Sequence, residues 1–362
     1  MNISDKDYYS PSDFIRTQKY DAHMHYHTFN DLFVRKTKNA NIHLFTINTN
    51  LDSLSIDSQF EIAQFLHQRH TKTFNFLCTF DATLFSKKSF AEDAIEQIKK
   101  SMTAGAKGVK IWKNIGMSLK NEDGQYIMAD DPVFDPIFTF LEKEKIPLLT
   151  HLGEPQNCWL PVEQMTINSA KNYFSNNPEY HMYLHPEAPS YEQHLMARDR
   201  ILECYPGLIV VGAHLGSMEW NLEEVAKRLD RFPNFFVDIS GRFEYIFDQT
   251  IRNRNYVIDF FQTYQDRLLY GTDCFVTTFN SREWMNLFCT WFPQIYMNLL
   301  FRNKFRTIKK HWLFLATDKL IKTGRISNKS NMPDLTRGLK LSKNIVDLVF
   351  YKNAHFVYNI TY

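Results

Sequence analysis

Two histidines close a short apolar run in the stretch Lys19-Tyr20-Asp21-Ala22-His23-Met24-His25. If this stretch is a β-strand, its side chains alternate between two faces, so His23 and His25 point in the same direction. Neutral imidazole nitrogens are preferred ligands of zinc and similar divalent metals, and one strand fixes two of them side by side. A solvated strand end with two polar side chains would show the same local pattern. The rest of the chain has to decide between these interpretations.

The composition predicts a cytoplasmic protein with a sizeable core. The chain has 362 residues, 44% of them hydrophobic, which is enough for a domain of roughly 250 residues with additions. Its 42 basic and 40 acidic residues give a formal net charge of +2, which favours neither nucleic acid nor a membrane as a partner. Residues 1–13 are polar, and no apolar run is long enough to span a bilayer. The five cysteines lie far apart, which indicates a reducing compartment: Cys78, Cys158, Cys204, Cys274 and Cys289.

Short apolar stretches alternate with helical patterns, as in parallel sheets with helical crossovers. Eight stretches are predicted to be strands: residues 19–23, 42–48, 74–80, 108–112, 147–150, 208–213, 235–240 and 268–270. Helices are predicted at residues 57–70, 90–103 and 343–354, and another begins near Asp131-Pro132. No glycine-rich dinucleotide fingerprint follows the first strand. Eight βα units therefore favour an α/β fold with a closed (β/α)8 TIM barrel over an open sheet.

We predict a single barrel domain over residues 1–362. Residues 1–18 form an N-terminal arm, and residues 274–362 form C-terminal helices that complete the barrel. The longest connection follows the fifth strand, from residue 152 to 189. Connections of this length are commonly binding loops, so we expect a partial lid lined with aromatic side chains. A contact between subunits of a homo-oligomer is the alternative for the same segment.

Polar side chains lie at the C-terminal ends of predicted strands one, five, six and eight. They are His23, His25, His151, His214 and Asp273. In a (β/α)8 barrel these strand ends converge on one mouth, where active sites form. Residues scattered over the sequence would therefore meet in space, which favours the metal interpretation of the two opening histidines.

These features resemble the amidohydrolase superfamily, specifically its amidohydrolase-2 branch, which includes metal-dependent hydrolases and relatives of aminocarboxymuconate-semialdehyde decarboxylase. The resemblance extends from Tyr20 to Tyr358. The matching segments are Asp21-Ala22-His23-Met24-His25, Gly108-Val109-Lys110, Pro147-Leu148-Leu149-Thr150-His151-Leu152-Gly153, Gly212-Ala213-His214-Leu215-Gly216, Pro233-Asn234-Phe235-Phe236-Val237-Asp238-Ile239-Ser240, Tyr270-Gly271-Thr272-Asp273 and Tyr351-Lys352-Asn353-Ala354-His355. The sequence departs from many relatives after Lys110, where it carries Ile111-Trp112-Lys113.

The resemblance implies one divalent metal, most simply Zn, with Mn or another divalent ion as alternatives. Its implied ligands are His23, His25, His151 and Asp273. Three nitrogens and one carboxylate leave room for a water or a substrate oxygen, as a catalytic site requires. Asp273 is expected to take a proton from that water and deliver it to the leaving group. For His214 we keep three roles open: a hydrogen bond to the water or the developing oxyanion, a ligand of a second metal, or a strand cap.

Residues around the mouth are expected to contact the substrate. Lys110 and Trp112 share one face of the fourth strand by alternation, and we favour an uncarboxylated Lys110 beside one metal over a carboxylated bridge between two. A structural ion pair with Asp21 or Asp238 is a further alternative for this lysine. Arg242 follows the seventh strand and is the candidate clamp for a substrate carboxylate, with a surface ion pair as its alternative. Glu154 and Trp159, both in the long connection, complete the predicted substrate contacts.

We expect the first of three functions and keep the other two as alternatives. The first is metal-dependent hydrolysis of a small ester, lactone or amide, with water activated by Asp273. The second is non-oxidative decarboxylation or hydration of a carboxylated small molecule on the same ligands. The third is a non-catalytic binding barrel.

Overall fold

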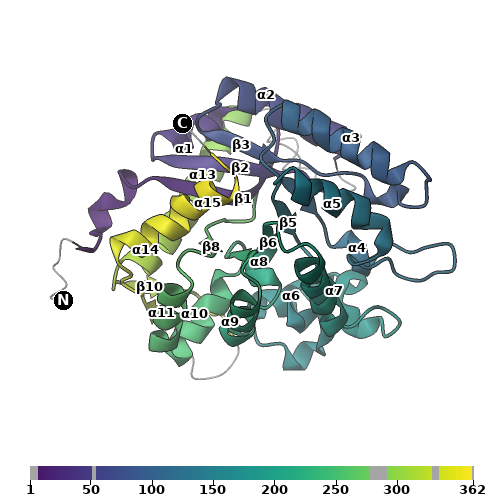
Figure 1. Cartoon of the computed structure of the whole chain (residues 1–362). Coiled ribbons are helices and arrows are strands. Elements are labelled where there is room, and N and C mark those ends of the chain that lie inside the picture. Colours follow the sequence, from purple (N-terminus) through teal and green to yellow (C-terminus); the bar gives the residue numbers. More distant parts are fainter. Residues whose placement is uncertain (1–6, 51–53, 278–291, 328–333, 361–362) are drawn as a thin grey trace.

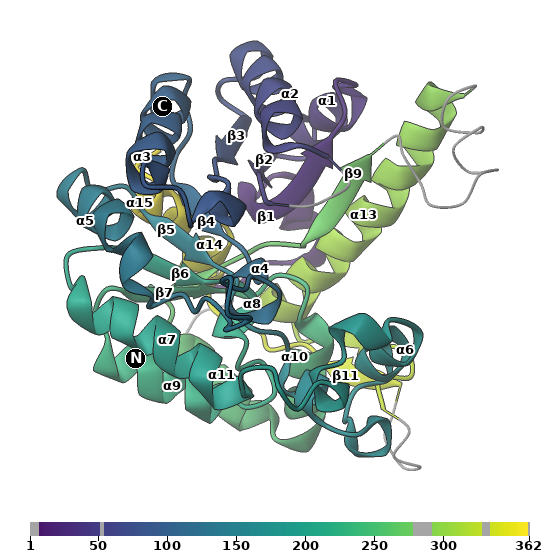
Figure 2. The ribbon, with the colours of Figure 1, turned by 90° about the vertical axis from the view of Figure 1, so that its right-hand side faces the viewer.

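The computed structural model describes residues 7–50, 54–277, 292–327 and 334–360, and its centre is a ring of parallel strands surrounded by helices (Figures 1 and 2). The strands pair in two sheets, one with the order β3-β2-β1-β9 and one with the order β4-β5-β6-β7-β8. The first eight strands are β1 (Lys19–His27), β2 (Ile42–Ile47), β3 (Phe74–Leu77), β4 (Val109–Ile111), β5 (Leu148–Thr150), β6 (Val210–Gly212), β7 (Phe235–Asp238) and β8 (Leu268–Leu269). Their residues are mostly apolar and buried on both faces, as central parallel strands require.

Two contacts join these sheets into a closed barrel. At one seam, Cys78 at the end of β3 forms a parallel bridge with Val109 of β4. At the other seam, the backbone N–H of Ala22 in β1 donates to the carbonyl of Tyr270, which follows β8, over 2.9 Å. The predicted (β/α)8 TIM barrel is therefore confirmed. Every observed barrel strand lies within its predicted stretch except β1.

The strand β1 is longer than predicted and continues to His27. A ninth strand, β9 (Cys274–Thr277), directly follows Asp273 and pairs in parallel with Met24 to His27. The sequence did not suggest β9, and it explains the extra length, because backbone groups that would otherwise lack partners find them in β9. As a result His25 lies inside a paired strand.

Amphipathic helices cover the outside of the barrel (Figure 2). The observed bounds of α3 (Phe90–Thr103) are those predicted, and this helix buries Phe90, Ala94 and Ile98 against the barrel. The other helices around the strands are α1 (Leu32–Lys38), α2 (Ile56–Arg69), α5 (Asp135–Lys143), α7 (Tyr191–Cys204), α9 (Leu222–Arg231), α10 (Phe243–Arg252), α11 (Arg254–Thr263) and α13 (Pro293–Ala316). None of the described helices combines the length and the apolarity that a membrane span needs.

The end of the chain closes one end of the barrel. Inward-pointing side chains such as Phe45, Leu149 and Val211 form a buried cluster with Val357 and Tyr358. Val357 ends the last helical segment and Tyr358 follows it as the C-cap. This segment consists of α14 (Lys343–Asp347), a π turn (Leu348–Lys352) and α15 (Asn353–Val357), where a helix was predicted at residues 343–354. Because this segment fills the N-terminal end of the barrel, the opposite end is left for a site.

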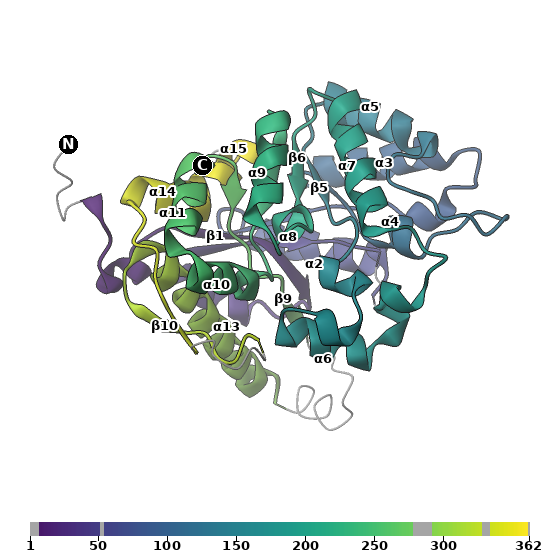
Figure 3. The ribbon, with the colours of Figure 1, turned by 90° about the horizontal axis from the view of Figure 1, so that it is seen from below.

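The segment after β5 is more ordered than the predicted loop. It contains α6 (Asn168–Asn176) and several short 3-10 turns. The Ser169 hydroxyl donates to the Glu244 carboxylate of α10, and Asn157 Nδ2 donates to the Tyr245 hydroxyl over 3.0 Å. In Figures 1 and 3, α6 lies away from α14 and α15, at the other end of the barrel. A hairpin of β10 (Leu320–Lys322) and β11 (Leu335–Arg337) was not predicted either.

The described cysteines are free thiols. Cys78, Cys158 and Cys274 are buried free thiols, and Cys204 is an exposed one. Cys289 lies outside the described residues.

Candidate metal centre and active site

The strand β1 presents two imidazoles toward the same spot, as its alternation predicts. His23 Nδ1 lies 2.7 Å from Asp238 Oδ2, and His25 Nδ1 donates to the Ile47 carbonyl over 3.1 Å. These bonds assign the ring proton to Nδ1 in both histidines and leave the Nε2 lone pairs free. Burial lowers the pKa of His25, which favours the neutral ring.

Both Nε2 atoms face Asp273. Its Oδ1 lies 3.6 Å from His23 Nε2 and 3.4 Å from His25 Nε2. The backbone of Asp273 is in the left-handed region, with φ 57°, and its N–H donates to the His23 carbonyl over 2.7 Å. A side chain on the preceding Gly271 would lie 2.7 Å from His23 Cβ, so the small residue permits this close approach. The turn after β8 therefore places the Asp273 carboxylate beside the two histidines of β1.

The donor set of these three residues fits a divalent cation. Two nitrogen lone pairs and a carboxylate oxygen are all acceptors, and they converge within 4.8 Å of one another. Donor atoms about 2.0–2.2 Å from a tetrahedral metal lie roughly 3.3–3.6 Å apart, which matches the two distances to Asp273. Burial alone would raise the pKa of Asp273, but the surrounding histidines hold it well below its ordinary value. His23, His25 and Asp273 thus form a candidate metal site.

A second cluster, consisting of His23, His214 and Asp238, is explained by hydrogen bonds. Asp238 Oδ1 accepts from the backbone N–H groups of His214 and Ser240, both over 3.0 Å, and from the Ser240 hydroxyl over 2.6 Å. Its Oδ2 lies 2.7 Å from His23 Nδ1. Both oxygens are engaged by hydrogen bonds, so Asp238 is placed to orient the ring of His23 and not to bind a cation itself. The sequence reading considered Asp238 only as a partner for Lys110, although its place at the end of β7 was the available signal.

Replacing Asp238 with asparagine is expected to lower metal affinity by about 10–100-fold, the usual effect of losing such a supporting carboxylate. The amide cannot hold the Nδ1 proton of His23 with a negative charge, so the ring loses basicity and orientation. Titration with a competing chelator measures this affinity. Unchanged affinity in Asp238→Asn would show that His23 needs no orienting group.

His214 and His151 lie beside this site. Ser240 accepts a 2.9 Å hydrogen bond from His214 Nδ1 through its carbonyl, and His214 Nε2 lies 4.0 Å from Asp273 Oδ2. Burial lowers the pKa of His214 to about 3, so the ring is neutral and Nε2 is an acceptor. The His151 ring lies 4.5 Å from the His214 ring, centre to centre, but it belongs to neither cluster of converging ligand atoms. Its role as a metal ligand stays a prediction.

Lys110 lies inside the barrel, as alternation along β4 predicts. Its Nζ has no hydrogen-bond partner within the described part of the chain, and burial lowers its pKa to about 8. The negative charges that act on it are those of Asp238 and Asp273. Lys110 therefore lies close to the candidate site, with its charge state sensitive to what binds there.

A cavity of about 490 Å³ opens above the candidate site. His25, His151 and Asp273 lie in its wall, together with Trp112 and Glu154, two of the residues predicted to contact the substrate. The aromatic lining is Trp112, Tyr173, Phe174, Tyr180, Tyr245 and Phe275. The predicted lid therefore supplies part of the wall through α6 and the turn at Tyr180. Trp159 is not among the lining residues, because it packs against Tyr191 and His194.

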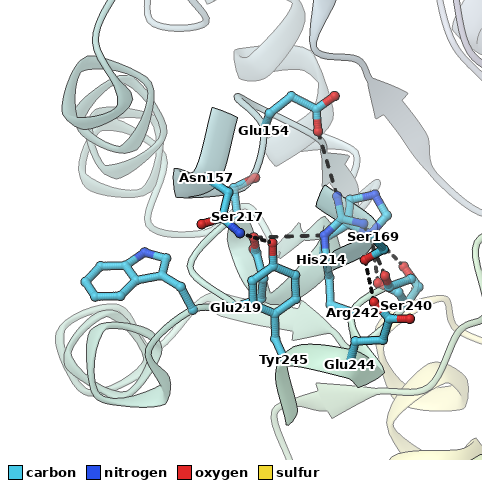
Figure 4. A network of polar contacts seen from close by, with 12 residues as sticks. Glu154, Asn157, Ser169, His214, Ser217, Glu219, Ser240, Arg242, Glu244 and Tyr245 are labelled. Carbon is cyan, nitrogen blue, oxygen red and sulfur yellow. Dashed lines mark hydrogen bonds and ion pairs between the residues drawn. The ribbon is translucent and has the colours of Figure 1, made fainter. Parts of the chain in front are cut away.

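Charges of alternating sign run along one side of this cavity. Lys113 Nζ bonds the Glu154 carboxylate, and Glu154 Oε2 lies 3.8 Å from a terminal nitrogen of Arg242. On its other side, Arg242 Nε lies 4.0 Å from Oε1 of Glu219 (Figure 4). Arg242 thus lies at the cavity, and its role as a clamp for a substrate carboxylate stays a prediction. The sequence did not single out Lys113, although it directly follows the predicted fourth strand, or Glu219, which lies beyond the end of the sixth.

Fold and site together define a (β/α)8-barrel enzyme with a candidate His/Asp divalent-metal centre. Residues 84–360 match the Amidohydrolase family of the amidohydrolase-2 type, and the chain belongs to this family, as its motifs predicted. The matched region includes Asp273, whereas His23 and His25 precede it. No curated protein matches the chain significantly.

Three solved structures illustrate what the chain is similar to. A dihydroxybenzoic acid decarboxylase from Polaromonas sp. JS666, solved with manganese and 2-nitroresorcinol, shares 11% identity over 95% of this chain and 97% of that one, with a TM-score of 0.48. A putative 2-pyrone-4,6-dicarboxylic acid hydrolase from Pseudomonas putida shares 10% over 95% and 98%, also at 0.48. An uncharacterised TIM-barrel protein from Bordetella bronchiseptica shares 18% over 70% and 85%, at 0.42.

Proposed function

We propose that the protein is a metal-dependent hydrolase that acts on a small molecule with an ester, lactone or amide bond. The arrangement of Asp273 supports this most directly. One carboxylate oxygen faces the two histidines of β1, while the other lies 4.0 Å from His214 Nε2. A base and a second acceptor therefore flank one place where water can enter.

The proposed metal ligands are His23, His25 and Asp273, with His151 as the fourth. A single Zn is the first candidate and Mn the alternative; such an ion lowers the pKa of a bound water and polarises a carbonyl oxygen. Asp273 Oδ2 accepts the proton of the attacking water and returns it to the leaving group. His214 Nε2 orients the water by accepting its second hydrogen, because its Nδ1 proton is committed to Ser240.

Substrate contacts follow from the cavity wall. The aromatic side chains of α6 and its neighbours exclude water and pack against the apolar part of the substrate. Arg242 offers its N–H groups to a carboxylate, and Lys113 adds a second positive charge nearby. Lys110 stays uncarboxylated in this proposal, beside a single metal.

The same two cations favour one other reaction class. A substrate with a carboxylate held near the metal could lose carbon dioxide or add water across a double bond, on the same ligands. Arg242 and Lys113 at the wall are the observation behind this second candidate.

An assay of product type separates the two candidates. The metal-loaded protein is incubated with a panel of lactones and aryl esters while acid release is followed with a pH indicator, and with N-acyl amides while the freed amine is followed with an amine-reactive dye. A parallel panel of aromatic acids is followed by carbon dioxide release. Saturable acid release that a chelator abolishes is expected; carbon dioxide release without acid release would replace hydrolase with lyase. Retained ligand binding after metal removal, without turnover in either panel, would favour a binding barrel.

A further inference from the structure

Glu219 is a buried carboxylate that the proposed reaction does not use. It has no exposed surface, and neither of its oxygens has a hydrogen-bond partner among the described residues. Burying a carboxylate in this state is costly unless an opposite charge lies close by. Burial raises the pKa of Glu219, and the cation that opposes this shift is Arg242. The side chain therefore depends on Arg242 for compensation.

Arg242 depends on Glu219 in turn. Its Nε has no hydrogen-bond partner in the described regions and points toward Glu219 Oε1, 4.0 Å away (Figure 4). Burial opposes the charge of Arg242, but the carboxylates of Glu219 and Glu154 outweigh it and raise the pKa of the guanidinium. Arg242 lines the cavity, whereas Glu219 does not. Glu219 thus lies behind the guanidinium, on the side away from the substrate.

The distance between these two residues is set by rigid structure. Arg242 directly precedes the first residue of α10. Gln249 of the same helix donates from Nε2 to the backbone carbonyl of Glu219 over 2.8 Å and accepts from the Leu222 N–H over 3.0 Å. One helix therefore fixes both the arginine and the backbone that carries the glutamate. A carboxylate held in this way can set the orientation of a flexible side chain.

We propose that Glu219 is a positioning residue for substrate binding, because its buried carboxylate holds the Nε edge of Arg242 and turns the terminal N–H groups toward a substrate carboxylate. This inference rests on the proposed role of Arg242. It goes further by assigning the orientation of the clamp to a residue that never touches the substrate. It also predicts selectivity for carboxylates over uncharged analogues of the same shape.

Binding of two matched probes tests this assignment. The affinities of metal-loaded protein for 4-fluorobenzoate and for 4-fluorobenzamide are measured by fluorine NMR at pH 8, where Glu219 is ionised. In Glu219→Gln, affinity for the benzoate is expected to fall about tenfold, while affinity for the benzamide stays within about twofold. Glu223→Gln is the control, because this glutamate lies on the surface and pairs with Lys227.

A role of the Glu219 charge and a role of its packing predict opposite orders of benzoate affinity for two variants. Glutamine keeps the shape of Glu219 without its charge, and aspartate keeps the charge in a shorter side chain. Positioning by charge predicts that Glu219→Asp binds the benzoate better than Glu219→Gln. The reverse order, or an equal loss for the benzamide, would assign Glu219 a packing role and overturn the inference.

Variants of Arg242 separate this inference from the proposed function. Arg242→Gln is expected to weaken binding of the benzoate. Adding Glu219→Gln to this variant is expected to cause no further loss of affinity. If wild-type protein does not bind the benzoate, or Arg242→Gln binds it unchanged, the carboxylate clamp itself is wrong. If Arg242→Gln weakens binding of the benzoate while Glu219→Gln does not, Arg242 binds the carboxylate but Glu219 does not position it.

Discussion

Asp273→Asn is expected to lose its bound metal and to lower turnover by at least about a thousandfold, the scale of removing both a ligand and a base. Asp273 Oδ1 is the shared neighbour of the two Nε2 atoms of β1, at 3.6 and 3.4 Å. The amide has the same shape but no negative charge. It can neither attract a divalent cation as strongly nor accept the proton of water.

The measurement is elemental analysis of purified protein together with acid release in the product assay. We expect about one equivalent of metal in the wild type and less than about a tenth in the variant. Asp266→Asn is the matched control, since Asp266 is exposed on the turn before β8. Full metal content in Asp273→Asn, in a folded protein, would remove Asp273 from the ligand set.

The barrel could be predicted because each parallel strand leaves a recognisable local pattern in the sequence. Each has a short apolar run that needs burial on both faces, and helical periodicity lies between the runs. The extension of β1 and the strand β9 could not be predicted in this way. β9 begins directly after Asp273 and forms because β1 has free backbone groups beside it. The strand β9 therefore depends on its spatial neighbour β1 and not on a local sequence pattern.

The same difference explains the site. His23, His25 and Asp273 were predictable because topology alone brings C-terminal strand ends together. Asp238 was overlooked as a site residue because its role depends on the closure of the barrel between β8 and β1, which puts it 2.7 Å from a histidine 215 residues earlier. Glu219 gave no sequence signal, since it follows an irregular turn in which His214, Leu215 and Ser217 have positive φ. Trp159 was chosen for its residue type, and its packing away from the cavity could not be inferred from that.

Glu219→Gln is expected to stabilise the fold by an amount that grows with pH. Burial raises the pKa of Glu219 to about 7 from an ordinary value of 4.5. Below pH 4.5 the carboxyl is protonated in both the folded and unfolded states, so its charge costs nothing. Between pH 4.5 and 7 the unfolded state releases the proton first, and stability falls as pH rises. Above pH 7 the full cost of about 3 kcal/mol is present.

The comparison of two pH values isolates this residue. The charges of Arg242 and Glu154 act on Glu219 and already contribute to its raised pKa, while the raised pKa values of Tyr191 and Tyr245 keep both phenols neutral at either pH. At pH 8 the variant is expected to melt about 4 °C above the wild type, and at pH 5 the two should nearly coincide. Glu223→Gln, on the surface, should show no such trend. A melting difference that is the same at both pH values would mean that Glu219 is ionised throughout this range, held by Arg242 more firmly than its burial opposes.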